Sequence, residues 1–203
     1  MSQRRHRRLS PASVAALVAA ALIVLAAAIS PSQAVARSCG GVRFPDTADV
    51  DGTPLVLNGL GIREATILNV DVYVAALYVE QRGRRAADVL HLDRKIRLVL
   101  RFVRDVGRDE MNDGVREGFS RQNAGPALAP NIRRLAGWVP ELHTGNVLTF
   151  TWRPGVGLEM KVGQTIKGVL VGEDFARAFF SIWLGAHPPN EGLRAGLLGG
   201  SCG

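Results

Sequence analysis

The 203-residue sequence contains little of the chemistry that usually identifies a metal protein or a disulfide-rich scaffold. It has two cysteines and four histidines, and the histidines are scattered along the chain. Two cysteines without a histidine cluster make a poor metal site, so His91, His143 and His187 are interpreted as surface or capping residues. We therefore expect no metal and no other cofactor.

Familiar catalytic and nucleotide-binding motifs are also missing. The chain has no G-x-S-x-G, no H-E-x-x-H, no P-loop and no Rossmann glycine pattern. Acidic residues between positions 109 and 117 recur at helical spacing, but arginines lie among them. Such a mixture is typical of an ion-paired, solvated helix face. Motifs alone therefore do not identify an enzyme.

The positive charge is not concentrated in one region of the expected domain. The formal net charge is +7, and residues 1–36 contain four arginines and no acidic residue, so the remaining chain carries +3. The other arginines are interspersed with acids, whereas a nucleic-acid groove requires a basic cluster. We therefore expect no nucleic-acid partner.

Residues 1–36 have the three-part pattern of a secretory signal peptide. Residues 4–8 read RRHRR, residues 12–29 form an uncharged apolar run, and the small residues of SPSQAVA follow. Cleavage is expected after Ala34 or Ala36, which would leave residues 37–203 as one periplasmic or extracellular domain. A retained membrane anchor is the alternative, because the apolar run approaches the length that spans a bilayer. Membrane contact is expected only through this segment.

The two cysteines lie at opposite ends of the expected domain. Cys39 is close to its beginning and Cys202 is next to the end of the chain. In an exported protein such a pair predicts one disulfide that ties the two ends together.

Hydrophobic periodicity predicts an α+β domain. Strand patterns precede a mixed second half, which indicates an antiparallel sheet with helices packed to one side. The expected strands are 55–58, ending at Gly59, a hairpin of 62–70 and 72–79, and then 95–104, 147–152, 158–162 and 165–171. The expected helices are 84–92, 108–122, 131–142, 172–184 and 190–198.

One arginine stands out in the stretch LNGLGIREATILNVDVYVAALYVE, residues 57–80. Arg63 lies two positions after a G-x-G that we interpret as a tight turn, and an almost wholly apolar segment comes after it. An arginine in this position is either an ordinary surface charge or a group that holds an anion. Strand alternation places Tyr73 and Tyr78 on opposite faces of the sheet, so only one of them can point into a cleft.

Several longer stretches resemble the bacterial exported branch of the chalcone isomerase-like family. They are GLGIRE, DVYVAALYVE, IRLVLRFVRDV, LTFTWRPGVGLEM and DFARAFFSIWLGAHPPNEGLRAGLLG, and the resemblance extends from about Val42 to Gly199. It implies an open-faced β-sandwich, in which an antiparallel sheet is covered by helices, with a ligand cleft between the two layers.

The resemblance to plant chalcone isomerases covers only part of their catalytic set. Arg63 matches an arginine that follows a glycine-containing turn and stabilises developing negative charge. The plant enzymes also use a threonine on the next strand, at a position that corresponds to the neighbourhood of Tyr73 in this sequence. They further use a tyrosine and an asparagine on a helix, which corresponds to GRDEMNDGVREGF in this sequence. That segment has no tyrosine, and its Asn112 does not occupy the position of the asparagine.

The resemblance to non-catalytic members of the family gives a better match. In those members an arginine and a strand tyrosine hold a fatty-acid carboxylate, and Arg63 with Tyr73 fits that pattern. We therefore expect binding of a fatty acid or a similar small amphipathic anion. The alternatives are an intramolecular lyase or isomerase with Arg63 as electrophile, and an envelope accessory protein with a vestigial cleft. The apolar wall or core is expected to include Phe150, Trp152, Phe179 and Trp183.

Overall fold

The computed structural model describes residues 36–65 and 70–202. The chain divides into Met1–Ala34 and Val35–Gly203, and all of the secondary structure given below belongs to the second of these units. Residues 1–35 of the expected signal peptide lie outside the described residues. The expected connection at 69–71 of the 62–79 hairpin is wrong, because Val70 and Asp71 belong to the second strand and the first strand ends at Ala65. In the described part of the chain, no helix has the length and apolar character needed to cross a membrane.

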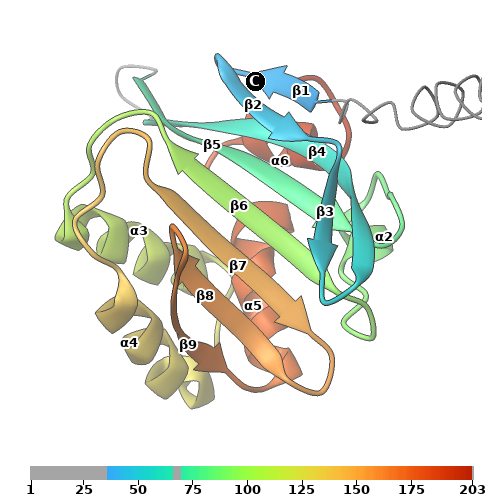
Figure 1. Ribbon diagram of the computed structural model, residues 1–203. Helices are drawn as coiled ribbons and strands as arrows, with labels where there is room; N and C mark the ends of the chain where they lie inside the picture. The colour runs from blue at the N-terminus through green and yellow to red at the C-terminus, as the bar shows by residue number, and fades with distance from the viewer. Residues whose placement is uncertain (1–35, 66–69, 203) are drawn as a thin grey trace, which may run out of the picture. The chain divides into compact units, whose positions relative to one another are not determined.

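Seven strands form one antiparallel sheet in which each strand lies beside its neighbours in the sequence (Figure 1). Most successive strands are joined by short connections, which permit only antiparallel pairing, whereas residues 103–146 form a long connection between Phe102 and Val147. The strands are β3 (Thr47–Val50), β4 (Thr53–Ala65), β5 (Val70–Val79), β6 (Ile96–Phe102), β7 (Val147–Arg153), β8 (Gly157–Val162) and β9 (Thr165–Leu170). The expected antiparallel sheet is confirmed.

A separate two-stranded hairpin precedes the sheet. It consists of β1 (Ala36–Cys39) and β2 (Val42–Pro45). Neither strand of this hairpin was predicted from the sequence, and neither was β3. Each of the three strands has only four residues and buries only one of them, so none produces a measurable alternation of polar and apolar positions.

The helices lie close to their predicted positions. They are α2 (Ala86–Val89), α3 (Arg108–Arg121), the 3-10 turn η1 (Pro126–Leu128), α4 (Ala129–Trp138), α5 (Glu173–Leu184) and α6 (Glu191–Leu197). Helix α5 begins with two acidic residues, whose charge complements the helix dipole, and it ends at Gly185. The expected helix at 84–92 is much shorter than predicted and has only four residues.

The sheet has a different covering on each of its two faces. Helices α3, α4, α5 and α6 pack on one face, where sheet residues such as Leu98 and Phe150 meet Phe179 of α5. The ring centroids of Phe150 and Phe179 are 4.7 Å apart. On the other face, Cys39 and Phe44 of the β1–β2 hairpin pack with buried residues of β4 and β5. This confirms the open-faced α+β sandwich.

The G-x-G before Arg63 is not a turn, and the prediction that a strand ends at Gly59 is wrong. Strand β4 runs without a break from Thr53 to Ala65. A Cβ atom added to Gly59 would lie 2.0 Å from the carbonyl oxygen of Gly196, and one added to Gly61 would lie 2.4 Å from that of Leu193. These glycines therefore allow the backbone of α6 to touch the backbone of β4.

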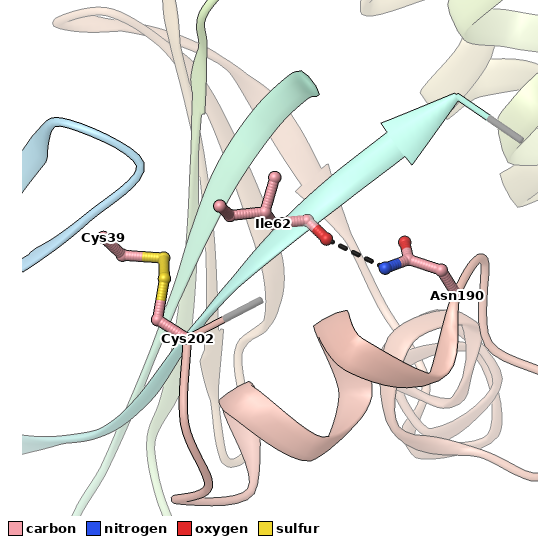
Figure 2. Close-up of a disulfide and its surroundings, with 4 residues drawn as sticks. All are labelled: Cys39, Ile62, Asn190 and Cys202. Carbon is pink, nitrogen blue, oxygen red and sulfur yellow. Dashed lines mark hydrogen bonds between the residues drawn. A yellow bond between two sulfur atoms is a disulfide. The ribbon is translucent and has the colours of Figure 1, made fainter. Parts of the chain in front are cut away.

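The predicted disulfide is confirmed, and it fastens the end of the chain to the opposite layer (Figure 2). Cys39 of β1 is bonded to Cys202, and their Cα atoms are 5.7 Å apart. On the same stretch of chain, Asn190 donates a hydrogen bond from Nδ2 to the Ile62 carbonyl oxygen at 3.0 Å. Helix α6 is therefore fixed on both sides. Asn190, just before the helix, bonds to Ile62 next to Arg63, and Cys202, beyond the end of the helix, forms the disulfide.

Candidate functional site

A cavity of about 490 Å³ lies between β4, β5 and the helices α3 and α5. Arg63 and Ala65 come from the end of β4, Val72 and Tyr73 from the start of β5, and His187 from the connection between α5 and α6. A cavity of this volume is within the range typical of small-molecule sites.

The cavity combines an apolar floor with a charged rim. The side chains of Val72, Val115 and Ile182 are buried, and with Met111 and Trp183 they form the floor. The rim is the exposed face of α3, which contributes Glu110, Asp113, Glu117 and Arg121. An elongated ligand with an apolar body and a polar end matches this division.

Arg63 and Tyr73 are directly opposite each other on neighbouring strands. They form a cross-strand pair in the β4–β5 register, so their side chains emerge on the same face of the sheet. An irregularity in the register follows at once, between Arg63 and Glu64. Such bulges occur next to functional sites because they re-aim a side chain. The Arg63 guanidinium donates one hydrogen bond, to the backbone oxygen of Glu64.

The three arginines of the cavity differ in their ion pairing. Arg104 is paired with Glu110 and Arg121 with Glu117. Within residues 36–65 and 70–202, Arg63 has no carboxylate within ion-pairing distance. Among the described residues, Arg63 is therefore the cavity arginine whose positive charge has no ion-paired carboxylate.

Tyr73 is a buried phenol with one polar contact. Its side chain is 6% exposed, and its hydroxyl oxygen accepts a hydrogen bond of 2.9 Å from Nε1 of Trp183. Burial raises the pKa of Tyr73 to about 12, although the Trp183 hydrogen bond and the nearby charge of Arg63 act in the opposite direction. The phenol is therefore neutral at physiological pH.

Tyr78 lies on the opposite face of the sheet from Tyr73, as strand alternation predicts. Its hydroxyl donates a hydrogen bond of 2.9 Å to the carbonyl oxygen of Pro45 in β2. Because Tyr78 belongs to the core beneath the β1–β2 hairpin, it does not line the cavity, and Tyr73 is the tyrosine that does.

The predicted aromatic set is only partly in contact with the cavity. Phe150, Trp152 and Phe179 lie in the core of the helix-covered face, and the Trp152 indole donates to the Leu92 carbonyl oxygen at 2.8 Å. Trp183 lies in the same core and also lines the cavity. Asn112 is buried in α3 and is not one of the cavity residues.

His187 is exposed, as predicted for a surface residue, and it also lines the cavity beside Pro189. This second role was not predicted from the sequence. The signal was available, because both residues belong to the GAHPPNEG part of the last stretch that carries the family resemblance. His143 is also exposed, and its Nδ1 lies 3.2 Å from Oδ2 of Asp105, away from the cavity.

The cavity residues can bind an anion but do not form the isomerase set. Helix α3 provides no tyrosine, and Asn112 lies outside the cavity wall. Among the described residues no group of three or more histidine, cysteine or acidic side chains could hold a metal ion. What remains is a guanidinium and a neutral phenol above an apolar floor.

Comparison with known proteins agrees with this architecture. The family described as chalcone isomerase-like matches residues 36–199, while no curated protein sequence matches the chain. The crystal structure of a fatty-acid binding protein of Arabidopsis thaliana is similar, with a TM-score of 0.64 at 15% sequence identity. The similarity covers 81% of this chain and 96% of the plant protein. The chain therefore belongs to the chalcone isomerase-like family.

Proposed function

We propose that this protein is an exported, non-catalytic binding protein for a fatty acid or a similar small amphipathic carboxylate. Arg63 is the anchor for the carboxylate and Tyr73 is its helper, while the apolar floor of the cavity receives the hydrocarbon chain. The observation that carries the proposal is the cross-strand pair of Arg63 and Tyr73 at the cavity, with no carboxylate of the described residues paired to Arg63.

The chemistry of the two groups favours a carboxylate. A guanidinium can hold a carboxylate through two parallel charge-assisted hydrogen bonds, and a phenol can add a third. The fold is shared with a plant fatty-acid binding protein, which supports the same class of ligand. The missing tyrosine of α3 weighs against the isomerase alternative.

The proposal of export rests on the signal-peptide pattern of residues 1–36. Strand β1 begins at Ala36, so cleavage after Ala34 would leave β1 and the disulfide intact. Sequencing the N-terminus of the protein recovered from outside the cytoplasm would test this. A mature chain that still carries residues 1–34 would support the retained anchor instead.

Native mass spectrometry of the purified protein tests the binding function. We expect the wild-type protein to carry a fatty acid or to take up added decanoate, and we expect Arg63→Ala to lose it. The matched control is Arg101→Ala, which removes the same charge from an exposed position on β6 outside the cavity and should bind normally. Wild-type protein that binds no carboxylate would contradict the proposal.

The same variants distinguish binding from catalysis. Turnover of a chalcone by the wild-type protein, lost in Arg63→Ala and kept in Arg101→Ala, would favour the isomerase alternative. We expect no turnover, because the cavity lacks the tyrosine and the asparagine that the isomerase set requires.

A further inference from the structure

We propose that Trp183 determines the ligand specificity of the cavity by fixing the direction of the Tyr73 hydrogen bond. The indole N–H donates to the Tyr73 oxygen, so the phenol offers its own hydrogen to the ligand. The cavity therefore binds an ionised carboxylate in preference to an alcohol of equal length. This inference rests on the proposed function and adds a positioning residue to it.

The direction of the Trp183–Tyr73 hydrogen bond follows from chemistry alone. An indole N–H can only donate, whereas a phenol can both donate and accept. At 2.9 Å the Tyr73 oxygen is therefore the acceptor. No acceptor for the Tyr73 hydroxyl hydrogen occurs among the hydrogen bonds of the described residues. A buried donor left without a partner costs about 1–3 kcal/mol, so this hydrogen requires an acceptor from a ligand or from water.

The two rings are held by packing, which fixes their orientation. Trp183 is 3% exposed and Tyr73 is 6% exposed. The Trp183 ring lies 5.0 Å from that of Phe179, and the Tyr73 ring lies 5.4 Å from that of Phe102 in an edge arrangement. Side chains locked in this way cannot turn to suit a different ligand head.

Two arginines of the cavity are donors as well, whereas the acceptor side chains Glu110, Asp113 and Glu117 lie on its exposed rim. A guanidinium has no acceptor atom, so Arg63 can only donate. Arg104 also lines the cavity, and its buried Nε has no acceptor among the described residues. A carboxylate has only acceptor oxygens and satisfies these groups, whereas an alcohol brings a hydrogen that must be placed among donors.

Neutral Tyr73 is essential to this selection, and its environment keeps it neutral. Burial raises its pKa to about 12, so the hydroxyl retains its hydrogen at neutral pH, where fatty acids are ionised. The same property makes Tyr73 unsuited to removing a proton from a substrate at neutral pH.

A double-mutant cycle with two probes tests the inference. Dissociation constants for decanoate and 1-decanol are measured by calorimetry on wild type, Trp183→Phe, Tyr73→Phe and the double variant. We expect Trp183→Phe to weaken decanoate binding roughly three- to tenfold, the effect of one hydrogen bond, and to leave decanol binding nearly unchanged. In the Tyr73→Phe background the same substitution should have no further effect on decanoate.

Other outcomes separate the inference from the proposed function. If Trp183→Phe weakens both probes equally, or acts as strongly without Tyr73, then Trp183 has only a structural role and the inference is wrong. If the wild-type protein binds neither probe, the proposed function itself fails.

A measurement on the wild-type protein covers the case in which Trp183→Phe does not fold. The chain has three tryptophans, so its indole N–H resonances are few and can be assigned. We expect the Trp183 N–H resonance to move much further on addition of decanoate than on addition of decanol, because both chains contact the cavity floor but only decanoate accepts the Tyr73 hydrogen as a charged group. A Trp183 resonance that is insensitive to decanoate bound in the cavity would overturn the inference.

Discussion

Tyr73 and Tyr78 lie five positions apart on strand β5 and look alike by every local measure. Both are buried, and burial raises the pKa of each to about 12. Their hydrogen bonds differ. The Tyr78 hydroxyl donates its hydrogen to the Pro45 carbonyl oxygen. The Tyr73 hydroxyl accepts a hydrogen bond from Trp183, and among the described residues its own hydrogen has no acceptor.

Two arginines repeat this contrast between the faces of the sheet. On the face away from the helices, Arg97 donates to Thr151 Oγ1 and to the Asp49 carbonyl oxygen, each at 3.0 Å. Arg63, on the cavity side, donates only to its neighbour Glu64 in the described part of the chain. Residue type and burial therefore do not distinguish a structural side chain from a ligand-binding one. The distinction is whether the donor groups of the side chain already have acceptors within the protein.

The largest expected effect is the loss of the disulfide that joins the two layers. Cys39 and Cys202 are 163 residues apart, and closing so long a loop contributes about 4–5 kcal/mol in the chain-entropy model. The double variant Cys39→Ser/Cys202→Ser should lose stability of that order in urea denaturation. Wild-type protein in reducing agent is the control and should behave in the same way. A loss below about 1 kcal/mol would contradict this prediction.

The contact between α6 and β4 is expected to have the next largest effect. Gly59→Ala places a Cβ atom 2.0 Å from the Gly196 oxygen and 2.6 Å from that of Leu197. Because both neighbours are backbone atoms, α6 must move, at an expected cost of about 1–3 kcal/mol or more. Decanoate binding should weaken as well, since α6 is tied to the residue beside Arg63 through Asn190 and Ile62.

Gly137→Ala in α4 is the matched control for Gly59→Ala. A Cβ atom at Gly137 would meet nothing within 4 Å, and alanine is favoured over glycine in a helix by about 0.5–1 kcal/mol. The control should therefore be neutral or stabilising. Equal thermal stability of the Gly59→Ala protein and the control would show that α6 does not need the glycine.

The smallest expected effect comes from exchanging each tyrosine for phenylalanine. Tyr73→Phe should weaken decanoate binding roughly tenfold, near the lower end of the about 1.5–3 kcal/mol that a hydrogen bond to a charged group contributes, because Arg63 still holds the carboxylate. Tyr78→Phe should leave binding unchanged and lower stability by about 1–3 kcal/mol, because the Pro45 oxygen loses its donor. Calorimetry and thermal unfolding of both variants measure this. If both lower affinity to the same extent, the distinction between the two faces fails.

The sequence predicted more of the fold than of the site. Long periodic segments such as those of α3 and α5 were correctly placed, because their apolar spacing is a local property. The glycines at 59 and 61 were misinterpreted as a turn, since a turn and a close helix contact require the same residue type. His187 was correctly predicted as a surface residue, but its place at the cavity was not predicted, because a single histidine has no periodicity.

By itself, the sequence determined the α+β class, the disulfide pair and Arg63 as a candidate anion-binding residue, because each of these follows from residue types and their spacing along the chain. Only the tertiary structure decided what the candidates do. Tyr73 meets Trp183 across 110 residues, and Gly59 meets Gly196 across a longer interval. Such contacts depend on which side chains the packed layers bring together, and no local pattern of residues records them.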